Sequence, residues 1–286
     1  MPETTVGFIG GSGLYNMDGL TNTQEVDVQT PYGQPSDSIV TGELDGISVA
    51  FLPRHGRGHR ISPSELPVRA NIYAMKQLGV QRLISISAVG SLKEELKPLD
   101  LVVPDQIIDR TRERPSTFFG EGLVAHVGFA DPFCHALRSQ AVEAAAGETD
   151  VHDGGAYVVI EGPQFSTRAE SEMHRSWGAS IVGMTALPEA RLAREAEMCY
   201  VTLAFVTDYD VWHDSEEDVS VELVVQNLMQ NVRTAQTIVR RMASSVPGVR
   251  SCGCGRALEN AIITSRDLIP PATRKRLGPL VDKYLD

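Results

Sequence analysis

The chain has 286 residues, of which 42% are hydrophobic and 22% charged, a composition typical of a globular protein and enough for one large α/β domain. Its formal net charge of −11 argues against a general nucleic-acid or membrane-surface binder, because a phosphate surface repels such a protein. No apolar run is long enough to span a bilayer, and the first residues lack the basic stretch that opens a signal peptide. A cytoplasmic location is therefore expected.

Strand-like and helix-like segments alternate along the chain, which predicts an α/β fold with a sheet that is largely parallel in its core. Asp45-Gly46 is a hairpin signal between two strands, and Thr167 with Glu170 predicts a capping box at a helix start. A short helical ending is expected after Val249. The strands are expected at 6–9, 38–44, 47–52, 83–87, 157–160, 180–183 and 199–206, and the helices at 62–78, 167–177, 188–197 and 219–244.

Four of the expected strands end in small or polar residues, and ligands of such sheets bind at the carboxyl ends of strands. The glycine-rich turn at 10–13 has neither the spacing of a dinucleotide fingerprint nor that of a P-loop. It either cradles a single anion with its backbone N–H groups or is only a tight turn. The four strand ends are at Gly10-Gly11-Ser12, Arg54-His55, Ser87-Ala88 and Thr207-Asp208.

The segment 54–59 places two arginines and two histidines at the end of an apolar strand. The forked donors of arginine match phosphate oxygens, and the glycines between them let the backbone come close. A solvated basic loop is the alternative. A metal held by His55 and His59 is disfavoured, because no helix holds both rings on one face and no third ligand pattern lies nearby. The pattern favours an anion site at Arg54 and His55.

Asp208 and Asp210 stand where the last expected strand leaves the core. Two carboxylates one residue apart point the same way on extended backbone. A partly buried carboxyl group holds its proton near neutral pH and is able to donate it. The alternative is a capped turn before the loop at 212–214.

Ten short motifs connect these separate signals. In their order along the chain they resemble the methylthioadenosine phosphorylases, which belong to the trimeric branch of the purine nucleoside phosphorylase superfamily. The resemblance covers about residues 6–246. It implies a single-domain phosphorylase/hydrolase-like α/β fold for residues 1–286, with a central mixed β-sheet flanked by helices and a helical tail at 247–286. The motifs lie at 10–13, 53–56, 69–72, 87–92, 104–106, 109–111, 161–170, 184–185, 188–189 and 207–210.

The resemblance also implies a role for each matching position. Arg54, His55 and Asp208 match the catalytic residues. Met184 matches the residue under the ribose, and Phe165 matches the ring that packs against the base. The matching phosphate-binding positions are Ser12, Arg54, His55, Ser87, Ala88 and Thr185. The positions that line the pocket for the 5′ group are Val221, Val224 and Val225, whose helical spacing also fits an ordinary helix core.

Base specificity follows from three further positions. Asp208 and Asp210 match the pair that reads the purine at N7 and the 6-amino group. Ser166 stands where relatives that prefer 6-oxopurines carry a glutamate, and Asp208 stands where they carry an asparagine. Both differences favour a 6-aminopurine, because a carboxylate accepts from an amine whereas a 6-oxo group needs a donor.

The implied reaction is phosphate-dependent cleavage of 5′-methylthioadenosine, with inorganic phosphate as co-substrate and without metal or organic cofactor. The implied assembly is a homotrimer, with a hexamer as the alternative, and His126 matches a residue that reaches into the neighbouring subunit's site. A broader purine nucleoside phosphorylase, which takes adenosine, 5′-deoxyadenosine or 6-oxopurine nucleosides, is the alternative within the same class. A nucleoside-binding module without catalytic activity is the alternative from another class.

The four cysteines are Cys134, Cys199 and the close pair Cys252-Gly253-Cys254. A zinc site usually has a second pair and a longer spacing within the first, so no metal site is expected from the sequence. The resemblance adds that some thermophile relatives carry a similar pair near the carboxyl terminus. A disulfide within that pair, or one that joins Cys134 to Cys199, is therefore a hypothesis.

Overall fold

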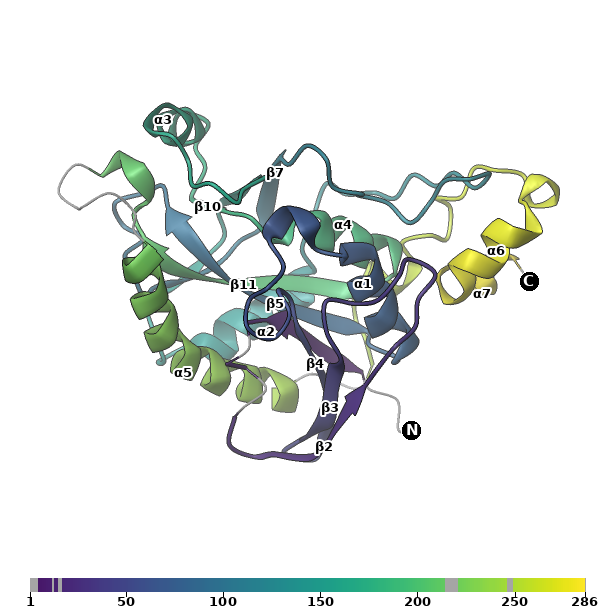
Figure 1. The fold of residues 1–286 in the computed structure, drawn as a ribbon, viewed down its shortest axis with the longest axis horizontal. Coiled ribbons are helices and arrows are strands. Elements are labelled where there is room, and N and C mark those ends of the chain that lie inside the picture. Colours follow the sequence, from purple (N-terminus) through teal and green to yellow (C-terminus); the bar gives the residue numbers. More distant parts are fainter. Residues whose placement is uncertain (1–4, 12, 15–16, 214–220, 246–248, 286) are drawn as a thin grey trace.

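The computed structural model describes residues 5–11, 13–14, 17–213, 221–245 and 249–285, with only the backbone described at 221–224 and 228. Within these residues, eleven strands form one mixed sheet with helices on both sides (Figure 1). None of the described helices is long and apolar enough to cross a membrane. The strands are β1 Val6–Gly10, β2 Leu20–Val26, β3 Ile39–Leu44, β4 Ile47–Pro53, β5 Arg82–Ser91, β6 Leu101–Val103, β7 Gln106–Arg110, β8 Val151–Asp153, β9 Ala156–Ile160, β10 Ile181–Gly183 and β11 Cys199–Asp208. The α-helices are α1 Val68–Gln77, α2 His135–Ala145, α3 Arg168–Ser176, α4 Ala186–Glu195, α5 Val221–Ser245, α6 Pro271–Leu277 and α7 Asp282–Leu285.

Strand β5 is the centre of the sheet. It pairs in parallel with β1 over its first half and with β11 along its length, and its last two residues pair antiparallel with β10. Strand β1 is also parallel to β4. The carboxyl ends of β4, β1, β5 and β11 therefore lie at the same edge of the sheet, and the polar strand ends singled out in the sequence follow or lie within them.

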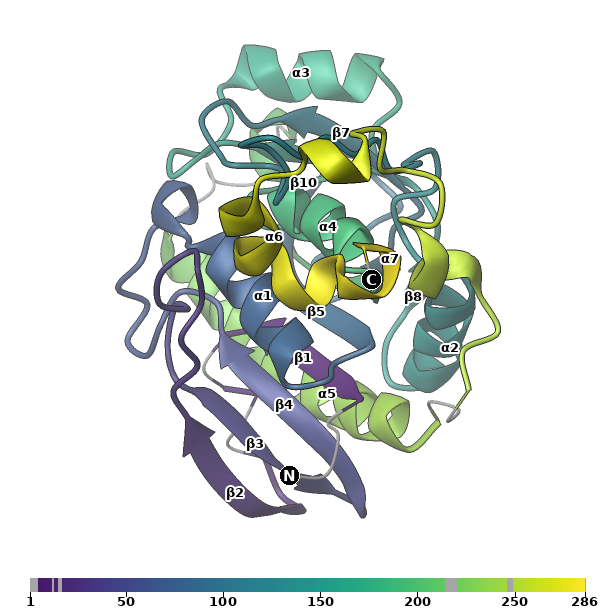
Figure 2. The same ribbon diagram turned by 90° about the vertical axis from the view of Figure 1, so that its right-hand side faces the viewer.

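Both faces of the central strands are buried. In β1, Phe8 belongs to the hydrophobic core on one face and Ile9 to the core on the other, and Phe51 and Leu52 of β4 divide in the same way. This alternation follows from the two-residue period of a strand. Helices α1 and α4 cover one face, whereas α2 and α5 pack on the other (Figures 1 and 2).

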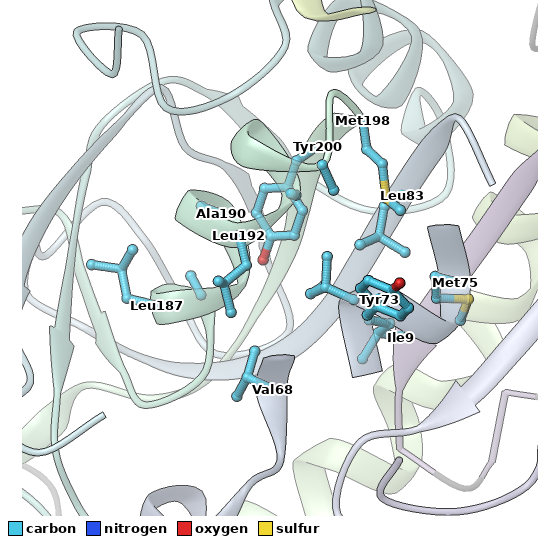
Figure 3. Close-up of a cluster of buried hydrophobic side chains, with 14 of the residues drawn as sticks. Ile9, Val68, Tyr73, Met75, Leu83, Leu187, Ala190, Leu192, Met198 and Tyr200 are labelled. Atoms are coloured by element: carbon cyan, nitrogen blue, oxygen red, sulfur yellow. The ribbon is translucent and has the colours of Figure 1, made fainter. Parts of the chain in front are cut away.

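The carboxyl-terminal tail completes the core under α1 and α4. Leu277 and Val281 are fully buried there with residues of both helices. Figure 2 shows α6 and α7 crossing in front of α1, and Figure 3 shows the side chains of this core, among them Tyr73 of α1 and Leu192 of α4. The tail therefore packs as part of the same hydrophobic core as the sheet.

The expected elements agree with the structure except for one helix start and for five elements that were not expected. The helix expected from residue 62 is a 3₁₀ turn at Pro63–Glu65, and α1 begins only at Val68, after Pro67, which has no N–H to donate. Strands β2, β6, β7 and β8 and helix α2 were not expected. Strand β2 is largely exposed and polar, so its sequence lacks apolar alternation. The hairpin at Asp45-Gly46 and the capping box of Thr167 with Glu170 are confirmed.

Candidate active site

Arg54 follows β4 and is the most completely bonded side chain at this edge of the sheet. Its backbone N–H donates to the carbonyl oxygen of Gly10 at 2.9 Å, which holds it beside the glycine-rich turn. Its Nε donates to Glu189 at 2.6 Å, and its Nη2 donates to Ser85 at 2.6 Å and to Glu189 at 3.2 Å. Burial alone lowers the pKa of Arg54, but the attraction of Glu189 outweighs it and the net shift is upward. Arg54 is thus a permanent cation whose position is fixed by a buried ion pair.

Three buried hydroxyl groups beside Arg54 are unpaired in the described structure. They belong to Ser87 of β5, Tyr157 of β9 and Thr185, the residue before α4. Burial raises the pKa of Tyr157, and the nearby hydroxyls of Ser87 and Thr185 and the guanidinium of Arg54 oppose that rise. A buried polar group without a partner costs free energy, so three of them together indicate a site that a ligand completes. Each hydroxyl offers one donor, which suits an anion.

His55 adds a neutral ring to this group. Its Nδ1 lies 2.8 Å from the carbonyl oxygen of Ile61, which only accepts, so Nδ1 carries the hydrogen and Nε2 remains an acceptor. Burial and the nearby Arg54 lower the pKa of His55 to about 4. The ring also stacks on His59, with 4.3 Å between the ring centroids. Before a ligand binds, His55 is therefore uncharged at neutral pH.

Asp208 is the last residue of β11 and is buried there. Its Oδ1 accepts from the backbone N–H of Asp210 at 2.9 Å, and its Oδ2 accepts from the hydroxyl of Thr207 at 2.7 Å. Gly90 of β5 lies directly opposite, where an added Cβ would meet Oδ1 of Asp208 at 2.9 Å. Close strand pairing without a side chain at Gly90 therefore leaves room for this carboxylate.

Asp210 differs from Asp208 because one of its oxygens, Oδ2, is buried and unpaired within the described residues. Burial raises the pKa of Asp210, and the nearby hydroxyls of Ser171 and Ser166 oppose the rise without reaching hydrogen-bond geometry. Its backbone has a φ of 52°, a left-handed conformation that is uncommon outside glycine. The structure thus brings Asp208 and Asp210 together, with Ser166 close to Asp210.

Arg114 holds the loop that carries Met184. Its side chain, 3% exposed, donates to the carbonyl oxygens of Met184 at 2.5 Å and Leu187 at 2.9 Å, and it pairs with Glu161. The Met184 side chain lies against Gly162, where an added Cβ would clash with its sulfur. The two loops on either side of the site are therefore tied to one cation.

The remaining predicted residues occupy less enclosed positions. Ala88 is partly buried within β5, beside Ser87. Phe165 is 44% exposed and Val225 is 46% exposed, and His126 is exposed on a segment whose backbone N–H donates to Ala261. Ser12 and the side chains of Val221 and Val224 lie outside the described residues. A separate pocket of about 570 Å³ includes Ser36, Asp37 and Arg60 in its lining and none of the predicted site residues.

Four further residues of this region were not assigned a role from the sequence. Tyr157 begins a predicted strand and Glu189 lies in a quoted motif, so both had a local signal. Asn227 of α5 donates to the carbonyl oxygen of Thr207 at 2.6 Å, and polar residues on the inner face of an otherwise apolar helix would have indicated it. No local pattern pointed to Arg114, because its partners lie 47 to 73 residues away along the chain.

The chain is similar to known phosphorylases over nearly its full length. The phosphorylase superfamily model matches residues 5–244. The S-methyl-5′-thioadenosine phosphorylases of Koribacter versatilis and Geobacter sulfurreducens are 55% and 53% identical, each over 99% of this chain and over 97% and 100% of their own length.

Solved structures give the same result. A methylthioadenosine phosphorylase from an antarctic soil metagenomic library superposes with a TM-score of 0.92 at 50% identity, covering 98% of this chain and 99% of its own. The Schistosoma mansoni enzyme in complex with adenine superposes with a TM-score of 0.84 at 36% identity, covering 90% and 96%. The chain belongs to the S-methyl-5′-thioadenosine phosphorylase family of the phosphorylase superfamily.

Proposed function

We propose that this chain, a pentosyltransferase, catalyses phosphorolysis of 5′-methylthioadenosine to adenine and 5-methylthioribose 1-phosphate. The observation that carries the proposal is that two sets of buried oxygen atoms, one of donors and one of acceptors, lie at one edge of the sheet. The hydroxyls of Ser87, Tyr157 and Thr185, which have no partner in the part of the chain that the structure describes, form a donor group. The carboxylates of Asp208 and Asp210 form an acceptor group. Such a division suits a substrate pair with an anion at one end and an amino-substituted base at the other.

In the proposed mechanism, phosphate binds to the donor group and to Arg54. One Nη1 hydrogen of Arg54 goes to the carbonyl oxygen of Ile86 at 2.8 Å, and we assign the other to phosphate. The neutral His55 accepts from the P–OH of the phosphate through Nε2. We expect the bond to the base to stretch first, so that positive charge develops on the ribose opposite the bound anion, which then captures the sugar.

The leaving base is activated by the acceptor group. We assign Asp208 to N7, where a hydrogen bond or a transferred proton makes adenine a better leaving group, and Asp210 to the 6-amino group. Ser166 lies beside Asp210, and a serine there leaves room for an amine rather than supplying an acid for a 6-oxo group. Phe165 and Met184 are assigned to the base and the ribose.

The remaining site residues, the domain organisation and the assembly are inferred from membership of the family. We infer that Ser12 and Ala88 belong to the phosphate site, that Val221, Val224 and Val225 line the 5′ subsite, and that residues 1–286 act as one nucleoside phosphorylase domain. A homotrimer is proposed, with the exposed His126 reaching a neighbouring site, and the mass of the native protein in solution tests this assembly. One family structure is described as an adenosine/methylthioadenosine phosphorylase, so adenosine is the first competing substrate to measure.

The test of the proposed function is Asp208→Asn. The fold accepts the amide, because Oδ1 still accepts from Asp210 while the Thr207 hydroxyl turns to the carbonyl oxygen of Val89, 3.2 Å away. We expect kcat/KM for methylthioadenosine to fall about 100-fold, since a general acid contributes at least about that factor. Relative activity on inosine should rise. The measurement is phosphate-dependent release of adenine or hypoxanthine from methylthioadenosine, adenosine and inosine.

The matched control is Asp100→Asn, which alters a buried aspartate that accepts from the backbone N–H of Lys97 and pairs with His152. We expect this variant to keep wild-type substrate preference. Unchanged methylthioadenosine turnover in Asp208→Asn would contradict the assignment of Asp208, and failure of the wild type to release adenine in phosphate would contradict the proposed function.

A further inference from the structure

All four cysteines of the chain gather at the opposite end of β11 from Asp208. Cys199 is the first residue of β11, Cys134 precedes α2, and Cys252 and Cys254 lie in the tail at the start of a 3₁₀ turn. Their Sγ atoms all lie within 4.8 Å of one another, and Cys199 and Cys252 approach to 3.3 Å. Three of the four residues are buried and Cys252 is partly buried.

We propose that Cys134, Cys199, Cys252 and Cys254 form a tetrathiolate site for one zinc ion. Zinc prefers four thiolates in a tetrahedron with bonds of about 2.3 Å, which places the sulfurs about 3.8 Å apart. Four atoms that are mutually within 4.8 Å need only small shifts to reach that geometry. Binding deprotonates four thiols and releases four protons, so no oxidant or reductant takes part.

The sequence argument against a metal depended on local spacing, and the fold removes that argument. The short Cys252-Gly253-Cys254 pair meets a second pair that is assembled from two distant positions. The backbone N–H of Cys134 donates to Tyr200 at 2.8 Å, and that of Cys199 donates to Gln81 at 2.9 Å. Backbone hydrogen bonds therefore hold both of these ligands in place.

The charges around the sulfurs favour thiolates. Four thiolates with one zinc ion carry two net negative charges. The Nη1 of Arg194 lies 3.9 Å from the sulfur of Cys254, and Cys134 stands at the positive end of the 11-residue helix α2. Arg82 is the register partner of Cys199 in the β5–β11 pair, which places a second cation beside the cluster.

The site is structural. Four protein ligands leave no open position for substrate, and the cluster lies about 30 Å from Asp208 along the ten-residue strand at about 3.3 Å per residue. Its ligands join the tail to the sheet and to α2. Figure 2 shows the tail passing beside α2 before it crosses in front of α1. Zinc therefore fixes the tail at its start, ahead of the segment that completes the core.

Two disulfides are the competing arrangement. Within the sequence-based hypotheses, the pairs would be Cys134 with Cys199 and Cys252 with Cys254. The shortest contact in the structure, between Cys199 and Cys252, instead joins one hypothetical pair to the other. Because every sulfur lies near every other, the arrangement fits one central ion better than it fits two separate disulfide bonds.

The experiment measures metal directly on the full-length protein. The protein is purified under reducing conditions, incubated with zinc, desalted and analysed for metal and for free thiols. We expect one zinc per chain and thiols that react only after a chelator is added. Exchange for cobalt(II) should give the thiolate-to-cobalt charge-transfer band and the visible bands of tetrahedral cobalt. These readouts do not depend on enzymatic activity.

The variant Cys252→Ser changes the most accessible ligand, and Ser251→Ala is the matched control in the adjacent position. We expect Cys252→Ser to weaken zinc retention at least tenfold in a chelator competition, while Ser251→Ala retains zinc like the wild type. If Cys252→Ser fails to fold, the cobalt spectrum of the wild type remains the test. Four freely reactive thiols without bound metal, two disulfides formed under reducing conditions, or cobalt bound without the thiolate band would each overturn the proposal.

Discussion

The two ends of the buried strand β11 differ in whether their buried side chains lie close to partners within the protein. At the Asp208 end, oxygens of Asp210, Ser87, Tyr157 and Thr185 are buried and have no hydrogen-bond partner among the described residues. Asp210, Ser87 and Thr185 belong to short sequence motifs. At the Cys199 end, four sulfurs lie within 4.8 Å of one another, and they come from three separate places in the sequence. An end with unpaired oxygens is arranged for a ligand that comes and goes, whereas an end whose side chains meet one another is arranged to hold the chain together.

Between the two ends, the polar groups are paired with one another. Glu189 of α4 accepts from Arg54, from Ser85 and from the hydroxyl of Tyr200, and Thr202 donates to Tyr200 in turn. A fully satisfied buried network is rigid, whereas one with a missing partner is costly. This network therefore lies between the Asp208 end and the Cys199 end of β11, and it fixes Arg54 before phosphate binds.

The largest expected effect comes from breaking this network with Glu189→Ala. Removal of one partner leaves the Arg54 charge buried and uncompensated, which typically costs about 3–5 kcal/mol. We expect the free energy of unfolding to fall by about that amount. Phosphorolysis should be lost as well, because Arg54 is no longer held. Urea unfolding and the phosphate-dependent assay measure the two effects.

The control is Arg240→Ala, which breaks the ion pair with Asp45 on the surface. Exposed pairs contribute little to stability, so unfolding should change only slightly and activity should remain. If Glu189→Ala were as mild as Arg240→Ala, the interpretation of the network as the fixed middle of β11 would be wrong.

The next effect concerns pH and His55. Its pKa is about 4 in the folded chain, against an ordinary value of 6.5, so between these values the unfolded chain binds a proton that the folded chain does not. The free energy of unfolding should therefore fall as the pH drops through this window, by up to about 3 kcal/mol. His55→Gln removes this dependence. Urea midpoints near pH 7 and near pH 4.5 give the difference between the two proteins.

Glu195 also makes stability depend on pH, so the wild type must be compared with His55→Gln. Burial raises the pKa of Glu195 to about 7, so protonation of Glu195 stabilises the folded protein as the pH falls through much the same window. Both proteins contain Glu195, and its contribution cancels. Equal acid sensitivity of the wild type and His55→Gln would show that His55 is not the buried neutral ring described here.

The contrast between the two ends also explains what the sequence predicts. The strand ends with Arg54, Ser87 and Asp208 were predicted, because carboxyl ends of parallel strands meet at one edge and each end carries its own local signal. The helices with apolar periodicity were predicted for the same local reason. The contacts of Arg54 with Glu189 and of Arg114 with Met184 join residues that are far apart in the sequence. No periodic pattern predicts such contacts.

The gathering of the four cysteines is the feature that local reasoning could least foresee. Spacing within Cys252-Gly253-Cys254 gave no sign of the other two cysteines, which lie near this pair because β11 and α2 begin at adjacent points in space. That adjacency follows from strand order and helix packing rather than from residues near the pair. The polar strand β2 and the short strands β6 and β8 were missed because pairing partners, not apolar pattern, define them.

The smallest expected effect tests the unpaired hydroxyls through Thr185→Val. Because the Oγ1 of Thr185 is buried and without a partner among the described residues, its replacement by a methyl group should leave stability unchanged or slightly higher. Phosphate binding loses one donor to a charged group. We expect the KM for phosphate to rise about tenfold, while the KM for methylthioadenosine changes less. Steady-state kinetics with each substrate varied separately measure both constants.

Thr273→Val is the matched control, because Thr273 is also buried but its hydroxyl donates to the carbonyl oxygen of Glu121 at 2.5 Å. Here the same change removes a bond that is already made, so stability should fall by about 1 kcal/mol and the KM for phosphate should stay constant. The two variants thus have opposite expected signatures from one chemical change. A loss of stability in Thr185→Val without a change in phosphate KM would mean that its hydroxyl is structural, and the donor group would then need a different third member.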